Sequence, residues 1–143
     1  MKNIFFYILI LIFSYIVEVS AKDNFFEEAK NFFEKKKYEK SKFLFQRSIV
    51  FNPKHANSYL YLAKIFNIQE DENEELKNIN TTLLLDPNNE EALYMLIDIK
   101  LKRSNFSEVK ELQKRFNFAC STLCDKKQSI SERLNNIDIK DKS

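Results

Sequence analysis

Apolar residues recur at every third or fourth position through most of the chain after residue 22. A clear example is the group Tyr59, Leu62, Ala63 and Phe66. This spacing is the period of an amphipathic helix, and no sustained alternation of apolar and polar residues indicates a β-strand. The pattern therefore predicts an all-α protein.

Polar residues and prolines divide the pattern into segments of helical length. The expected helices are residues 24–35, 39–51, 55–67, 73–85, 89–102 and 106–118, with a seventh segment after the cysteines. Because the connections are short, neighbouring helices should form antiparallel hairpins. Asp71, three residues before Glu74, fits a capping box, and Asn89 is expected to cap the helix that follows it.

The first 21 residues have the layout of a secretory signal peptide. Lys2 supplies a positive start, residues 4–17 are apolar apart from one serine, and residues 19–21 offer small or modest side chains for cleavage. The apolar stretch has 14 residues, whereas a helix that crosses the bilayer needs about 20. We expect cleavage after Ala21 and export to the periplasm. The alternative is an uncleaved N-terminal anchor that leaves the protein facing the periplasm.

Export bears on the two cysteines, Cys120 and Cys124. An oxidising compartment permits a disulfide between them. On a regular helix a bridge between positions i and i+4 would be strained, so a bridge implies a helix end or turn near residues 119–125. Free thiols are one alternative. Redox or metal chemistry is another, although the chain has no C-x-x-C motif and offers one histidine as a further ligand.

Composition excludes several classes of site. The sequence has no glycine, and phosphate-binding loops, dinucleotide fingerprints and nucleophile elbows all need a residue without Cβ. His55 is the only histidine, and no acid–base pair stands out on which catalysis could rest. We therefore expect no enzymatic activity, no cofactor and no metal. An exported chain with a net charge of +2 is also a poor fit to nucleic-acid binding.

The chain repeats itself at an interval of 34 residues, since its two prolines are Pro53 and Pro87 (87 − 53 = 34). The same offset places Phe25 on Tyr59, Ala29 on Ala63, Phe32 on Phe66, Phe45 on Ile79 and Ser48 on Thr82. A helix–turn–helix unit of this length, with these large and small positions, resembles the tetratricopeptide repeat (TPR) family. The sequence departs from the family pattern at Glu28, which stands where the pattern has Leu, and its last unit lacks the closing proline.

The resemblance covers residues 22–121 and implies a short right-handed α-solenoid of stacked hairpins. Its three units would be residues 22–55, 56–89 and 90–121, of which the third is degenerate. Residues 122–143 would then supply a C-terminal capping helix and a loose tail. The apolar stripe of that helix would consist of Ile130, Leu134 and Ile137.

The resemblance also implies a function, which is to hold an extended or helical segment of another protein in a concave groove. Carried over position by position, the groove residues are Phe26, Lys30, Phe33, Asn57, Leu60, Lys64, Asn67, Tyr94, Asp98 and Leu101. Aromatic side chains beside Lys and Asn suit a peptide with apolar anchors and a carboxylate or carbonyl backbone. The alternative for Phe26, Phe33 and Leu60 is a packing role. The alternative function is that of a membrane-anchored envelope assembly factor.

Overall fold

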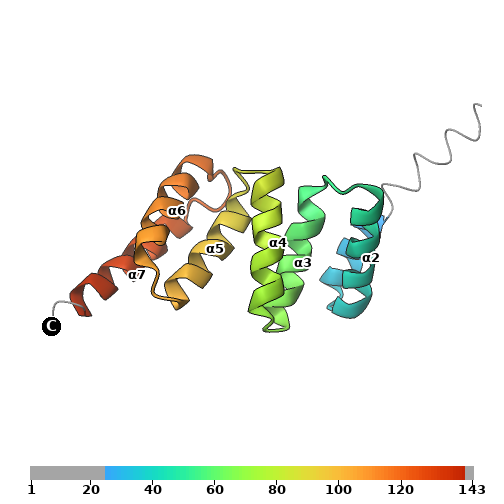
Figure 1. Cartoon of the computed structure of the whole chain (residues 1–143), viewed down its shortest axis with the longest axis horizontal. Coiled ribbons are helices and arrows are strands. Elements are labelled where there is room, and N and C mark those ends of the chain that lie inside the picture. Colours follow the sequence, from blue (N-terminus) through green and yellow to red (C-terminus); the bar gives the residue numbers. More distant parts are fainter. Residues whose placement is uncertain (1–24, 141–143) are drawn as a thin grey trace, which may run out of the picture.

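The chain is described here by a computed structural model, which covers residues 25–140. The predicted signal peptide, residues 1–21, lies outside this range. Residues 25–34 form the first helix, drawn in blue in Figure 1. It is followed by α2 (Tyr38–Phe51), α3 (Ala56–Ile68), α4 (Glu72–Leu85), α5 (Glu90–Lys102), α6 (Phe106–Ala119) and α7 (Lys126–Lys140). The described residues contain no strand, so the all-α prediction is confirmed.

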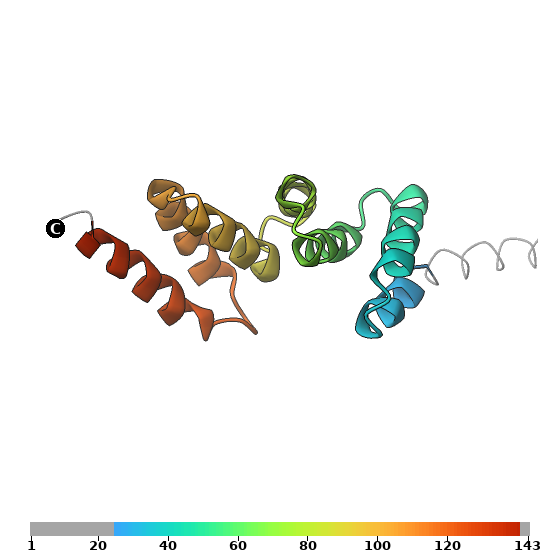
Figure 2. The same ribbon diagram turned by 90° about the horizontal axis from the view of Figure 1, so that it is seen from below.

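The helices form antiparallel hairpins that stand side by side along the long axis of the molecule (Figure 1). Each hairpin is a pair: the first helix with α2, α3 with α4, and α5 with α6. Helix α3 packs on both α2 and α4, and α5 packs on both α4 and α6. Helix α7 lies against α5 and α6 at the end of the row, as Figure 2 shows from below. The molecule is therefore a short α-solenoid in which each hairpin covers the next.

Large and small side chains alternate in the core, as the 34-residue offset predicts. Ala29, Ala63 and Thr82 are fully buried and allow the helices to approach closely. Phe45 and Ile79, also fully buried, fill the space between them. Burial of each large side chain contributes roughly 1.5–3 kcal/mol before the entropic cost of ordering it. The stacking of hairpins thus follows from the repeated size pattern.

The turn inside each hairpin uses a left-handed residue at the same repeat position. Lys36, Glu70 and Ser104 are 34 residues apart and have positive φ angles of 56°, 59° and 56°. In each turn the next backbone N–H donates to the carbonyl five residues earlier, at 2.9 to 3.0 Å. Glycine is the usual residue at such a helix end, because it alone lacks the Cβ that makes this conformation costly. This chain makes all three turns without one.

The predicted caps are confirmed. Asp71 accepts a hydrogen bond from the backbone N–H of Glu74 at 3.2 Å at the start of α4. Asn89 accepts one from the N–H of Ala92 at 3.0 Å at the start of α5. Asn105 caps α6 in the same way, which the sequence analysis did not predict. These polar residues fix where the second and third hairpins begin or turn.

Helix α7 covers the open end of the stack. Ile130 is fully buried and Leu134 is 6% exposed, and both belong to the same core cluster as α5 and α6. Ile137, the third member of the predicted stripe, lies outside the residues whose side chains the structure describes. Within residues 25–140 no helix has both the length and the apolar character needed to cross a bilayer.

Candidate functional site

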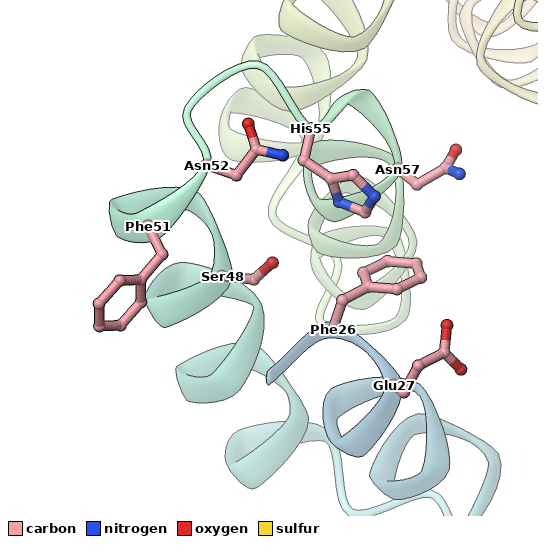
Figure 3. A pocket seen from close by; sticks show the side chains of 7 residues that line it. All are labelled: Phe26, Glu27, Ser48, Phe51, Asn52, His55 and Asn57. Atoms are coloured by element: carbon pink, nitrogen blue, oxygen red, sulfur yellow. The ribbon is translucent and has the colours of Figure 1, made fainter. Parts of the chain in front are cut away.

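A hollow of about 590 Å³ lies where the first helix begins, α2 ends and α3 begins. We call it the larger hollow, and Figure 3 shows its lining. The lining residues are Phe26, Glu27, Ser48, Phe51, Asn52, His55 and Asn57. Their side chains combine aromatic rings, carboxamides, a carboxylate and an imidazole. This mixture suits a segment that carries both an apolar side chain and hydrogen-bonding groups.

His55 is positioned in this hollow by a hydrogen bond and by ring packing. Its Nδ1 lies 2.8 Å from the Oγ of Ser58, and that oxygen lies 3.0 Å from the Oγ of Ser48. The ring of Phe26 meets the imidazole edge-on, with centroids 4.5 Å apart, and Figure 3 shows the two side by side.

A second hollow of about 280 Å³ lies between the starts of α3 and α5 and the loop after α6. We call it the smaller hollow. Its lining residues are Asn57, Leu60, Asn89, Glu90, Glu91, Thr122 and Leu123. The exposed Asn57 lines both hollows, so the two adjoin at the start of α3.

One wall of the smaller hollow is a carboxylate held by backbone N–H groups. Glu90 Oε2 accepts from the N–H groups of Ser121, Thr122 and Leu123 at 2.7, 3.0 and 3.1 Å. The Thr122 hydroxyl also donates to this carboxylate. The hydroxyl bond and the three N–H groups together hold the pKa of Glu90 at about 2, below its ordinary value of 4.5. Glu90 is therefore ionised at neutral pH, and its charge is satisfied within the chain.

The cysteines belong to this same loop. The structure places Sγ of Cys120 and Sγ of Cys124 2.14 Å apart, at bonding distance. Helix α6 ends at Ala119 and α7 begins at Lys126, so the pair lies in the kind of turn that a bridge requires. The bridge closes the loop that surrounds the Glu90 carboxylate.

The structure places the predicted groove residues in different environments. Phe26, Asn57 and Leu60 line the two hollows. Leu60 is nonetheless 5% exposed and Leu101 is 7% exposed, and both belong to the main core cluster. The expectation that Leu101 faces a partner is therefore wrong, because it packs inside the stack. Tyr94 also packs inward, with its ring centroid 6.1 Å from that of buried Phe116.

Two predicted polar groove residues are paired with carboxylates. Lys64 Nζ lies 2.6 Å from Glu91 Oε1 and 4.4 Å from the ring centroid of Tyr61. Asn67 donates to Glu75 at 3.0 Å. Burial raises the pKa of Glu75, which is 4% exposed. Lys64 therefore already has a carboxylate partner inside the chain.

Asp98, the predicted acidic groove residue, also lies in a bonded network. It accepts from Arg133 of α7 at 2.7 Å and pairs with Lys102 at 2.9 Å. The bond to Arg133 links α5 to the capping helix α7. The side chain of Asp98 thus fastens two helices together.

Aromatic packing accounts for much of the first unit. Phe33 meets Tyr61 at 5.2 Å and Tyr38 at 5.6 Å, both edge-on, so its packing role is the one observed. Tyr61 also stacks on Phe45 at 5.0 Å. Burial raises the pKa of Tyr61 above its ordinary value, and the positive charge of Lys30 lowers it in part. Sequence reasoning missed Tyr61, because this residue belongs neither to the apolar period around it nor to the groove positions carried over from the family.

The part of the chain that the structure describes contains no candidate metal site. Nowhere in residues 25–140 do three or more His, Cys, Asp or Glu side chains gather so as to hold a metal ion.

Comparison with known proteins identifies solved structures that have the same fold. No protein-family model matches the sequence, and no curated protein matches it. Solved structures do match. The Yersinia enterocolitica type III secretion chaperone SycD, in complex with a peptide of the translocator YopD, superposes with a TM-score of 0.71 at 14% identity, over 85% of this chain and 95% of that one.

Two further structures agree. The TPR2B domain of yeast Sti1, in its complex with pHsp70, matches with a TM-score of 0.67 at 14% identity, over 83% of this chain and 97% of that one. The C-terminal TPR-containing domain of a Plasmodium falciparum putative FK506-binding protein matches with a TM-score of 0.68 at 19% identity, over 87% and 93%. The fold is therefore that of a TPR-like α-solenoid, as the sequence resemblance indicated.

Proposed function

We propose that this protein is an exported interaction module that binds a segment of a partner protein along its two adjoining hollows. The observation that carries the proposal is the shared lining of the hollows by the exposed Asn57, at the start of α3. A segment lying there would cross from the first unit to the third. Such a site needs no catalytic group, and we propose no enzymatic role.

Structural neighbours support this use of the fold. The SycD structure contains a peptide of YopD, and the Sti1 domain is in a complex with pHsp70. These ligands are bound by those two proteins. By analogy, we propose that the present chain also binds a peptide or helix of another protein.

The chemistry of the larger hollow narrows the class of partner. The Glu27 carboxylate is an acceptor, and the rings of Phe26 and Phe51 are apolar. The site therefore fits a segment with an apolar anchor flanked by N–H donors or a basic side chain. This replaces the carboxylate ligand that the sequence alone suggested.

Export is part of the proposal and rests on the signal-peptide pattern of residues 1–21. N-terminal sequencing of the protein isolated from its native cells should return Lys22 as the first residue. An N-terminus at residue 1 would instead favour the alternative, a membrane-anchored assembly factor that faces the periplasm.

Affinity capture with two matched variants tests the binding site. Asn57→Arg places a long cation between the hollows, while Asn80→Arg makes the same change at an exposed position of α4 that lines neither hollow. Asn57→Arg should lose the partner that the wild type retains, and Asn80→Arg should keep it. Circular dichroism confirms that both variants fold. Equal capture by both variants would exclude the hollows as the binding site.

A further inference from the structure

The outer side of α2 carries a stripe of cations and apolar side chains. Its members are Lys40, Phe43, Arg47 and Val50, whose spacing of three, four and three residues places them on one face of the helix. All four are exposed; Phe43 is 56% and Val50 76% exposed. None of them lines either hollow. We call this set the α2 stripe.

Aromatic rings hold the two cations of the stripe close to the apolar surface. Lys40 Nζ lies 4.0 Å from the ring centroid of Phe32, and the Arg47 guanidinium lies 4.4 Å from that of Phe25. Both rings come from the first helix. Glu28 lies between the two phenylalanines on that helix, so among these described residues the two cations outnumber the one carboxylate. Cations resting on rings beside exposed apolar groups are arranged as at a water–hydrocarbon boundary.

The other units show what is particular about α2. At the same repeat positions α4 has Glu74, Lys77, Thr81 and Leu84, and α6 has Glu108, Glu111, Arg115 and Phe118. Leu84 is 81% exposed, as open as Val50, but the same face of α4 begins with Glu74, which pairs with Lys77 at 3.0 Å. Among the three second helices, only α2 combines exposed apolar residues with cations and no carboxylate in its stripe.

We propose that the α2 stripe binds the surface of a membrane that contains anionic lipids. Exposed apolar side chains interleaved with Lys and Arg match the headgroup boundary, where both burial and charge contribute to binding. A second copy of the chain fits less well. Pairing two stripes would bring like charges together.

A single fluorescent label tests the contact directly. Both native cysteines are bonded in the structure, so Val50→Cys and Leu84→Cys each provide one reactive thiol for the polarity-sensitive dye NBD. The labelled full chains are mixed with vesicles of phosphatidylcholine alone, or of equal parts of phosphatidylcholine and phosphatidylglycerol. The dye at position 50 should brighten and shift to the blue with the anionic vesicles, whereas the dye at position 84 should not change.

A variant that removes one positive charge tests the electrostatic contribution to membrane binding. Adding Arg47→Gln to Val50→Cys should weaken binding to the anionic vesicles about fivefold, and added salt should act in the same direction. Adding Lys77→Gln, which removes a cation from the corresponding face of α4, should leave the response intact. An unchanged signal at position 50, or an equal change at position 84, would overturn the proposal. So would a signal at position 50 that rises with protein concentration in the absence of vesicles, because it would indicate binding of a second copy.

Discussion

The carboxylate of Glu90 accepts a hydrogen bond from the backbone N–H of Ser121 at 2.7 Å. This contact joins the first turn of α5 to a loop 31 residues further along the chain. Two more N–H groups of the same loop point at the same oxygen. Because the loop leads into α7, the Glu90 carboxylate helps to place the helix that caps the stack.

Replacing Glu90 by Gln should lower the free energy of unfolding at pH 7 by about 1–2 kcal/mol, since the charge-assisted hydrogen bonds are lost at a partly open site. The folded-state pKa of about 2 lies below the ordinary 4.5. This stabilisation is therefore present above pH 4.5 and is lost as the pH falls towards 2.

Urea unfolding at a series of pH values checks this dependence. The difference between wild type and Glu90→Gln should shrink as the pH falls, whereas Glu111→Gln, at an exposed position of α6, should differ little from wild type throughout. A difference for Glu90→Gln that does not depend on pH would show that the charge of this carboxylate does not stabilise the fold.

Removing the bridge should weaken the same contact. Cys120 and Cys124 are separated by 4 positions, and the chain-entropy estimate for so short a loop is about 2 kcal/mol. Cys120→Ser with Cys124→Ser should lower stability by about that amount, and Glu90→Gln should cost less in this background than in the wild type. Strictly additive effects would mean that the bridge does not hold the N–H groups in place. Thiol labelling of unfolded, unreduced protein should modify neither cysteine.

Two phenylalanines on α2 provide a matched test of the core. Phe45 is fully buried, while Phe43 is 56% exposed. Phe45→Ala should lower the free energy of unfolding by about 3–5 kcal/mol, because it removes a large side chain and leaves a cavity. Phe43→Ala should change it by less than about 0.5 kcal/mol. Urea denaturation measures both, and a similar cost for the two variants would contradict the assigned packing.

At a left-handed turn, substitution by glycine should stabilise the protein. Glu70 has a φ of 59°, so Glu70→Gly should stabilise the protein by about 0.5–1 kcal/mol, because relief of backbone strain outweighs the entropy of the freer chain. Asn80→Gly, within helical α4, should destabilise it by a similar amount. Thermal melts of the two variants should move in opposite directions. A loss of stability in Glu70→Gly would show that its side chain contributes more than the strain costs.

Much of the fold could be predicted because it depends on short-range rules. The helical period and the polar breaks placed each boundary between residues 35 and 118 within one residue, and Asp71 and Asn89 cap as their sequence neighbourhoods indicated. The left-handed residues at 36, 70 and 104 gave no such signal. Glycine, the usual marker of that conformation, is absent from the chain.

The site was predicted less well because it depends on contacts between units. Lys64 belongs to the family's groove pattern, yet its partner Glu91 lies 27 residues away and only the stacking brings the two together. Leu101 was placed in the groove by the same pattern, but its burial follows from how α5 packs with its neighbours. Asn57, at the start of α3, lines both hollows, and its assignment to a partner-binding surface stays a prediction.

The most direct test of the central claim is photo-crosslinking from the hollows in native cells. A photoreactive benzoylphenylalanine replaces Asn57 in one full-length variant and Asn80 in another, both positions being exposed. The label at position 57 should capture one partner protein through a single contiguous segment with an apolar anchor, while the label at position 80 should not. Absence of a crosslink at position 57, or capture of the same protein in equal yield from position 80, would contradict it.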